Sequence, residues 1–213
     1  LSFSYGRMKV LEDISFSAES GSFTALLGRN GSGKTTLIRL LLGFLSPESG
    51  SVEIDGRDIA RMSTKERAMA IAYIPQQTES VYSYTVLDAV MMGLSPSLSV
   101  FKRPGRKEKD KAMEALSTLG IESLAGRYVN RISGGERQLV LIARSIAQDA
   151  RILLLDEPTS SLDYSNQMLV LETAGKLRGN GYTIILSTHN PEHALSHASS
   201  IIALSGTRLA YCG

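Results

Sequence analysis

Short runs of mainly apolar residues, each followed by a glycine, a proline or a polar residue, recur along the chain and predict buried strands. These runs cover residues 23–27, 70–74, 152–155 and 182–187. Their length and aliphatic content are typical of strands that are covered on both faces, as in a parallel sheet. The N-terminal residues 1–5 and 11–16 instead alternate between apolar and polar side chains, which predicts two half-buried strands.

The segments between these strands carry turn and helix signals. Asp55-Gly56 between two short segments predicts a hairpin, and Ser63-Thr64-Lys65-Glu66 has the spacing of a capping box that opens a short helix. From residue 77 to residue 132 the pattern is helical, with helices expected over 86–92 and 107–119. We therefore expect an α/β domain with an inserted helical lobe.

The residues after the first buried strand form a glycine-rich loop that leads into a helix. Gly28, Gly33, Lys34 and Thr35 occupy the four defining positions of the pattern G-x-x-x-x-G-K-[ST]. Closely spaced glycines let successive backbone N–H groups point inward, and the positive end of the following helix points to the same place. Lys34 would reach the β- and γ-phosphates, and the Thr35 hydroxyl would bind Mg²⁺. The alternative is a glycine-rich turn before a helix, but the complete pattern in register favours a nucleoside triphosphate site.

Two acids end the aliphatic strand at 152–155. Pro158 disfavours the helical conformation at Glu157, so we expect this acid to stay extended at the end of the strand. Because consecutive strand residues face opposite ways, Asp156 and Glu157 cannot share one role. A metal ligand and a base that activates water are a natural division. The alternative, a pair of surface acids, is disfavoured by the four buried aliphatic residues before the pair.

Four other features are ambiguous when taken alone. Gln76 follows Pro75 where a strand leaves the sheet, a place suited to a ligand, but it also fits ordinary loop chemistry. Ser133 to Glu136 opens a helix with an anion-binding geometry, although serine is a common helix cap. His189 follows the strand at 182–187, and a single histidine is more often structural. Tyr5 ends the first strand and, on the residues alone, is an ordinary half-buried strand tyrosine.

Other candidate groups favour structural interpretations. The basic run Lys102, Arg103, Arg106, Lys107, Lys109 and Lys111 is diluted by acids and indicates a solvated face, with a partner contact as the alternative. Met91 and Met92 are expected in the core rather than as adaptable contact residues. His193 and His197 are four residues apart on an expected helix, but no cysteine or third ligand supports a metal site. We interpret both histidines as surface residues.

Composition sets limits on the class of protein. The 213 residues include 23 Lys and Arg and 21 Asp and Glu, a net charge of +2 that indicates no binding of nucleic acid. No apolar run approaches the ~18 residues of a membrane span. The single cysteine, Cys212, cannot form an internal disulfide and suits a reducing compartment. Because the chain begins without methionine on strand-like residues, we expect further residues before Leu1 in the full protein.

The ordered combination of motifs resembles the nucleotide-binding subunit of an ATP-binding cassette (ABC) transporter, over essentially all 213 residues. The combination is the phosphate loop from Gly28 to Thr35, then Ser133-Gly134-Gly135, then Asp156-Glu157 after an aliphatic strand. The resemblance implies an ATPase with ATP and Mg²⁺ as its ligands. It also implies a RecA-like P-loop NTPase core with an antiparallel β subdomain, over 1–76 and 133–213, and a helical subdomain over 77–132.

The resemblance also implies a role for each site residue. Tyr5 would stack on adenine, Glu157 would be the catalytic base, and His189 would contact the γ-phosphate. Catalysis would further involve Lys34 and Gln76, and Mg²⁺ would be held by Thr35, Gln76 and Asp156. The residues expected to bind ATP are Tyr5, Gly28, Asn30, Gly31, Ser32, Gly33, Lys34, Thr35, Thr36, Ser133, Gly134, Gly135, Glu136 and Asp163.

The implied assembly is larger than one chain. In the family, the segment from Ser133 to Gln138 completes the ATP site of the opposite subunit, which implies a homodimer or a pair with another ABC subunit. Integral-membrane permease subunits and a separate substrate-binding protein are implied as well, with this chain peripheral on the cytoplasmic face of the (inner) membrane. Residues 84–93 and Glu136 look most like importers for ferric siderophores, haem, cobalamin or oxyanions such as molybdate.

Some residues depart from the family pattern, and some rival functions stay open. Ile132, Glu136 and Leu139 replace the commoner leucine, glutamine and arginine around the signature, which puts only the fine tuning of the interface in doubt. A small-molecule kinase would have no use for the Ser133 segment. A cassette ATPase of translation would resemble two linked cassettes, and a non-hydrolysing module would be expected to lack Glu157 or His189. A soluble ABC-type ATPase without a permease, or a transporter ATPase for another substrate class, is the main alternative.

Overall fold

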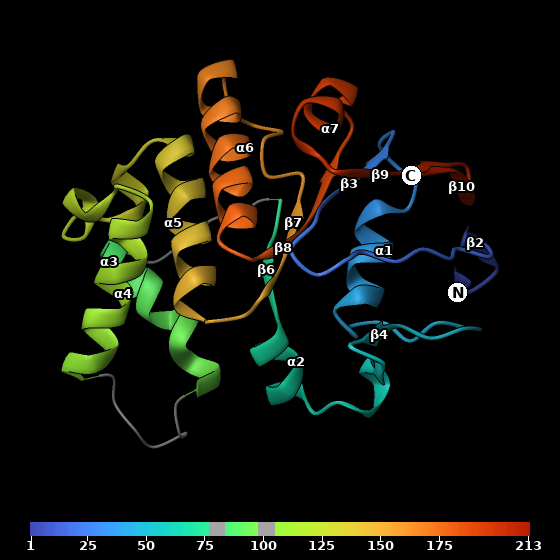
Figure 1. The fold of residues 1–213 in the computed structure, drawn as a ribbon, viewed down its shortest axis with the longest axis horizontal. Coiled ribbons are helices and arrows are strands. Elements are labelled where there is room, and N and C mark those ends of the chain that lie inside the picture. Colours follow the sequence, from blue (N-terminus) through green and yellow to red (C-terminus); the bar gives the residue numbers. More distant parts are fainter. Residues whose placement is uncertain (77–83, 98–104) are drawn as a thin grey trace.

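The computed structural model describes residues 1–76, 84–97 and 105–213. Its centre is a six-stranded sheet with the strand order β10-β9-β3-β8-β7-β6 (Figure 1). Strands β6 to β9 and β3 pair in parallel, and β10 pairs antiparallel to β9 at one edge. The strand bounds are β3 Phe23–Gly28, β6 Ile71–Ile74, β7 Ile152–Asp156, β8 Thr183–Thr188, β9 Ser200–Ser205 and β10 Arg208–Cys212.

Helices cover both faces of this sheet, with α1 on one side and α5 and α6 on the other (Figure 1). The α-helices are α1 Lys34–Leu41, α2 Thr64–Ala70, α3 Val86–Met91, α4 Arg106–Thr118, α5 Gly134–Ala147, α6 Tyr164–Gly179 and α7 Pro191–His197. Short 3₁₀ turns occur at Ile59–Arg61, Met92–Ser97, Glu122–Leu124 and Val129–Arg131. Two separate hairpins pair β1 (Phe3–Tyr5) with β2 (Met8–Leu11) and β4 (Glu53–Ile54) with β5 (Arg57–Asp58).

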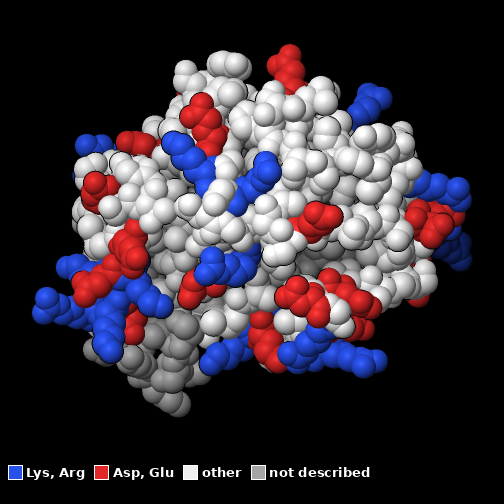
Figure 2. All heavy atoms as spheres, viewed as in Figure 1, with Lys and Arg blue, Asp and Glu red and all other residues white. Residues whose placement is uncertain are grey.

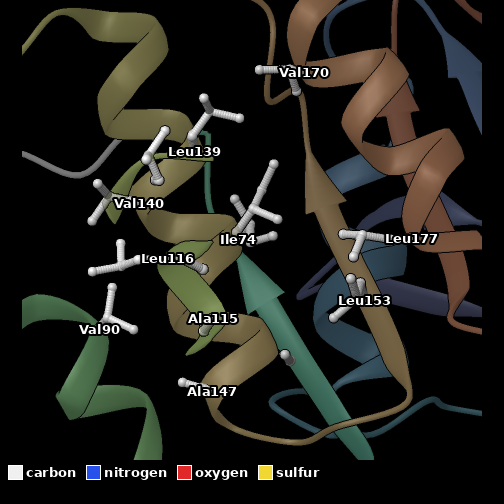
Figure 3. Close-up of a cluster of buried hydrophobic side chains, with 14 of the residues drawn as sticks. Ile74, Val90, Ala115, Leu116, Leu139, Val140, Ala147, Leu153, Val170 and Leu177 are labelled. Atoms are coloured by element: carbon white, nitrogen blue, oxygen red, sulfur yellow. The ribbon is translucent and has the colours of Figure 1, made fainter. Parts of the chain in front are cut away.

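The alternation of side chains along the strands divides the apolar residues between two cores. Leu153 and Leu155 of β7 point to the face covered by α3 to α6, whereas Leu154 points to the face covered by α1. Figure 3 shows the first core, in which Leu153 lies with Leu116 of α4 and other apolar side chains of β6, α5 and α6. Polar residues at the ends of these strands point to the two faces of the sheet by the same alternation.

Most element predictions are confirmed, but one strand prediction and two burial predictions are wrong. Met92, which was expected in the core, is 39% exposed. The Asp55-Gly56 hairpin and the Ser63 capping box are present, and α3 and α4 lie within one residue of the expected ranges. Residues 11–16 do not form a strand: β2 ends at Leu11, and Asp13 adopts a positive φ of 52° that turns the chain. His193 is 8% exposed rather than a surface residue, because α7 packs against β3 and β8.

The charged surface matches the balanced composition. Lys and Arg are interspersed with Asp and Glu on the face shown in Figure 2. The basic residues of α4, Arg106, Lys107, Lys109 and Lys111, are exposed as expected, whereas Lys102 and Arg103 lie outside the described residues. Within the described ranges, no helix has the length and apolar character needed to span a membrane.

Candidate nucleotide site

A cavity of about 350 Å³ opens beyond the carboxyl ends of β3 and β7. Open sheets of parallel strands bind ligands at this edge, because the loops that leave the strands meet there. The walls come from the phosphate loop, the β1–β2 hairpin and the ends of β6 and β7. The lining residues are Tyr5, Met8, Val10, Asn30, Gly31, Gly33, Lys34, Thr35, Thr36, Gln76 and Glu157.

The phosphate loop has the shape that its glycines predict. Gly33 adopts a φ of 93°, and a Cβ atom there would come within 2.9 Å of Leu11 Cδ2, so only glycine fits. Lys34 begins α1 and is 5% exposed, and its Nζ donates to the Gly28 carbonyl at 2.7 Å and to the Arg29 carbonyl at 3.1 Å. The Ser32 hydroxyl is buried without a hydrogen-bond partner among the described residues. This geometry fits a bound phosphate, which would accept hydrogen bonds from such donors.

Glu157 is the centre of a group of polar side chains at this cavity. Its Oε1 atom forms an ion pair with Lys34 Nζ at 2.9 Å, and both side chains are more than nine-tenths buried. Its Oε2 atom lies 3.4 Å from Gln76 Nε2 and 3.3 Å from His189 Nδ1. Four residues expected to act in catalysis are therefore brought together, although they are separated by up to 155 positions along the chain (34 to 189).

The backbone of Glu157 corrects one sequence-based expectation. Instead of continuing the extended strand, Glu157 has a φ of 45°, in the left-handed region. This conformation is unfavourable for a residue with a side chain, and the following Pro158 restricts it further. Such local strain persists only where the surroundings hold it, and it tends to occur at functional sites. The turn brings the Glu157 side chain back toward Lys34.

Asp156 lies behind Glu157 on the α1 face of the sheet and is 1% exposed. It accepts a hydrogen bond from Ser187 Oγ at 2.7 Å, and Tyr73 of β6 lies on the same face of the sheet. Burial, and to a lesser degree the Asp156 carboxylate, raise the pKa of the Tyr73 hydroxyl above its ordinary value. Sequence reasoning assigned no role to Tyr73 or Ser187.

The Ser133 segment and Asp163 do not line this cavity within the described chain. Ser133 caps α5 and forms a capping box with Glu136, and Asp163 caps α6 by accepting from the Asn166 N–H. Hydrogen bonds from the Ser133 backbone and side chain lower the pKa of Glu136, and those from Asn166 lower the pKa of Asp163. These residues form ordered helix ends outside the site that the other predicted residues make.

Tyr5 lies at the rim of the cavity, beside Met8 and Val10 of β2. It is 42% exposed, and its ring packs edge-on against Phe3 at 4.9 Å between the ring centroids. An aromatic face held at a rim can stack on a flat ring. Met8 and Val10 extend this apolar wall. Sequence reasoning missed both residues, because the turn that places them could not be located.

Comparison with known proteins identifies the family of the chain. Residues 11–160 match the protein family described as ABC transporter. An uncharacterized ABC transporter ATP-binding protein of Haemophilus influenzae is 42% identical over 96% of this chain and 78% of its own length. The ferric enterobactin transport ATP-binding protein of Escherichia coli is 37% identical over 96% of this chain and 76% of its length. Other relatives are named for manganese transport and molybdate import.

A solved structure of an ABC transporter has the same fold as this chain. A transporter assigned to the metal-chelate type, in an inward-facing conformation, superposes with a TM-score of 0.89 at 35% identity. The match covers 100% of this chain and 80% of that one. The predicted α/β P-loop fold of an ABC ATPase is thereby confirmed. The chain belongs to the ABC transporter family, as an ATP-binding subunit that hydrolyses ATP for transport.

Proposed function

We propose that this chain drives an importer of metal chelates, and that the cavity around Lys34 and Glu157 is its catalytic site. The observation that carries the assignment of the site is the contact of Glu157 with Lys34, Gln76 and His189 at the mouth of the phosphate loop. A carboxylate, an ammonium and an imidazole held together beside the glycine-rich loop suit the transfer of a phosphoryl group to water.

Hydrolysis in this site would depend mainly on positioning and on neutralisation of charge. Lys34 forms an ion pair with Glu157 in this structure. A γ-phosphate that binds Lys34 would replace Glu157 as the partner of the lysine and release the carboxylate. The released Glu157 could then accept a proton from a water molecule aligned for in-line attack. His189, which is half exposed and lies 3.3 Å from Glu157, would contact the same phosphate from the opposite side.

The residues around Asp156 fit Mg²⁺. This ion is usually held by one or two carboxylates together with phosphate oxygens and several waters. Asp156 supplies one buried carboxylate at the end of β7, next to Glu157, and Thr35 and Gln76 line the cavity. When bound there, Mg²⁺ would neutralise charge on the β- and γ-phosphates. Asp156 and Thr35 would hold the ion, with Gln76 beside it.

The assembly is proposed to be a dimer on a membrane permease. Ser133 to Glu136 and Asp163 are ordered helix ends that lie outside their own cavity, which suits the completion of a site on a second copy. We propose that residues 77–132 form the helical subdomain and meet the permease, and that a separate binding protein delivers the cargo. In this proposed assembly, the chain is a peripheral subunit on the cytoplasmic face of the inner membrane.

The cargo is inferred from two sources: residues 84–93 and Glu136 resemble importers of metal chelates or of oxyanions such as molybdate, and the enterobactin and metal-chelate proteins among the matches favour the chelates. No residue of this subunit would touch the cargo, so the inference passes through the permease class. Iron siderophores, haem and cobalamin are the proposed group. Molybdate and manganese are the nearest competitors.

Two experiments test these assignments. Glu157→Gln should retain ATP binding and lose turnover by at least ~10²-fold, whereas the exposed Glu172→Gln on α6 should behave as wild type. Turnover of Glu157→Gln near the wild-type rate would show that the base is elsewhere. For the cargo, cells that lack this subunit should lose uptake of labelled iron chelates or corrinoids. A defect confined to molybdate or manganese would replace the proposed cargo, and one confined to sugars or amino acids would reject the importer class.

A further inference from the structure

Three polar side chains lie on neighbouring strands, on the sheet face that α1 covers. Tyr73 is on β6, Asp156 on β7 and Ser187 on β8, and the parallel register pairs Asp156 directly with Ser187. Ser187 is 0% exposed. Its Oγ lies 2.7 Å from Asp156 Oδ1 and 2.8 Å from the backbone nitrogen of Glu157. One buried hydroxyl therefore contacts both acids of the site.

The chemistry of these groups settles the direction of both hydrogen bonds. A backbone N–H can only donate, so Ser187 Oγ accepts from Glu157. The hydroxyl has a single proton, and this proton remains available for the Asp156 oxygen. The serine thus orients the carboxylate of Asp156 and fixes the peptide of Glu157 at the same time. No other residue in the described part of the chain is shown to bond to both.

The contact with Glu157 falls where the backbone is strained. The ladder between β7 and β8 ends at Asp156 and Ser187, and the next residue turns to a φ of 45° before Pro158. The Glu157 N–H lies just after the last residue of β7, and it donates to the Ser187 hydroxyl. Glu157 contacts Lys34 from this turned backbone, and Ser187 bonds to the same peptide, so the orientation of the Glu157 carboxylate depends on the Ser187 contact.

We propose that Ser187 is a positioning residue that holds the metal-binding acid and the catalytic base in a fixed relation. The inference rests on the proposed roles of Asp156 and Glu157. Removal of the hydroxyl would let the Asp156 carboxylate rotate and the Glu157 turn relax. Both changes would disturb the geometry for chemistry while leaving the phosphate loop and the rim around Tyr5 intact.

The test compares two substitutions of nearly equal shape, Ser187→Thr and Ser187→Val, in the purified full chain. Threonine keeps the hydroxyl and valine lacks it, so added bulk is common to both. Ser145→Ala serves as a control for the loss of a buried serine hydroxyl, because Ser145 is 3% exposed and bonds only to the Leu141 carbonyl of its own helix. Measurements are kcat and KM for ATP, binding of a fluorescent ATP analogue at increasing Mg²⁺, and thermal unfolding.

We expect kcat of Ser187→Val to fall on the order of 10²-fold below that of Ser187→Thr, with KM for ATP within about threefold. The Mg²⁺ concentration at half-maximal analogue binding should rise about tenfold for valine, while affinity without Mg²⁺ stays unchanged. Ser145→Ala should match wild type in both. Equal kcat and equal Mg²⁺ midpoints for threonine and valine would overturn the proposal.

Two further outcomes are also decisive. If Ser187→Val unfolds and Ser187→Thr does not, Ser187→Ala is used in place of the valine variant, and its binding of the analogue is measured at low temperature. A Mg²⁺ midpoint of Ser187→Ala equal to that of wild type then overturns the proposal. If Glu157→Gln retains full turnover, the proposed function fails, but the Mg²⁺ midpoint of the valine variant still decides whether Ser187 positions Asp156. The two failures are therefore distinguishable.

Discussion

Glu157→Gln should alter the nucleotide-free protein as well as its turnover, because the carboxylate is the counterion of Lys34 in this structure. Lys34 Nζ has three partners: the Glu157 carboxylate and the carbonyls of Gly28 and Arg29. An ammonium group has three donors, so the lysine is fully satisfied. Glutamine would keep a neutral hydrogen bond but remove the negative charge. The buried Lys34 ammonium would then contact only neutral dipoles, namely the glutamine amide and the two backbone carbonyls.

The size of this effect follows from the geometry. At 2.9 Å and an effective dielectric constant of about 20, the direct attraction is ~6 kcal/mol. The retained hydrogen bonds offset about half, which leaves a loss of ~3 kcal/mol, at the low end of the range for breaking buried ion pairs. For a chain of this size, such a loss lowers the melting temperature by about 6–12 °C. A bound triphosphate replaces the carboxylate as the partner of Lys34, so ATP affinity should increase by up to ~10²-fold.

The assay is thermal unfolding of wild type, Glu157→Gln and the exposed control Glu172→Gln, each with and without ATP and Mg²⁺ under conditions that prevent turnover. Glu157→Gln should melt below both other proteins without nucleotide and show the largest increase with it. If the nucleotide-free melting temperature of Glu157→Gln lies within about 1 °C of the control and its ATP affinity is unchanged, the idea that Glu157 is the stabilising counterion of Lys34 is refuted.

Three further predictions concern other parts of the chain. Tyr5→Ala should weaken nucleotide binding by ~1–3 kcal/mol while Tyr5→Phe leaves it nearly unchanged, measured with a fluorescent analogue; equal affinity in all three would return Tyr5 to a structural role. Gly93→Ala should destabilise the fold by more than ~2 kcal/mol in urea unfolding, because a Cβ there would collide with the Arg144 carbonyl of α5, whereas Gly126→Ala meets no atom within 4 Å and should be mild. The pKa of Glu136 is lowered by its Ser133 hydrogen bonds, so its stabilising contribution is present above the ordinary glutamate range near 4.5 and is lost as the pH falls through the depressed folded value. Wild type should therefore melt above Glu136→Gln at pH 7 and converge with it in acid; a constant difference at all pH values would contradict this.

The elements that positioned the site could be predicted where local chemistry determined them. The phosphate loop was recognisable because Gly28, Gly33, Lys34 and Thr35 must stand at fixed spacing for the backbone to surround a phosphate. The helix start at Ser63 was recognisable because the capping serine and its glutamate are three residues apart. Strand β7 was recognisable because both of its faces are buried, which requires a continuous aliphatic run.

Features that depend on pairing between distant strands could not be predicted in this way. Ser187 lies beside Asp156 only because β8 pairs with β7 in one register, across 31 positions of sequence (156 to 187). The turn at Glu157 and the burial of His193 likewise depend on neighbours that no local pattern specifies. The false strand at 11–16 shows the opposite error: alternation was present, but β2 ended at Leu11 and Asp13 turned the chain.

The position of β3 in the sheet has a consequence for the order in which the protein can form. The strand that carries the phosphate loop begins at residue 23, and its two neighbours, β8 and β9, begin at residues 183 and 200. Ribosomes add about 5–20 residues per second, and β8 begins 160 residues after β3 (23 to 183). About 8–32 s therefore pass between the synthesis of β3 and that of the strand with which it pairs. ATP cannot assist the growing chain during this time, because the loop has no sheet to hold it. The nucleotide can stabilise only a chain that already includes β8 and β9.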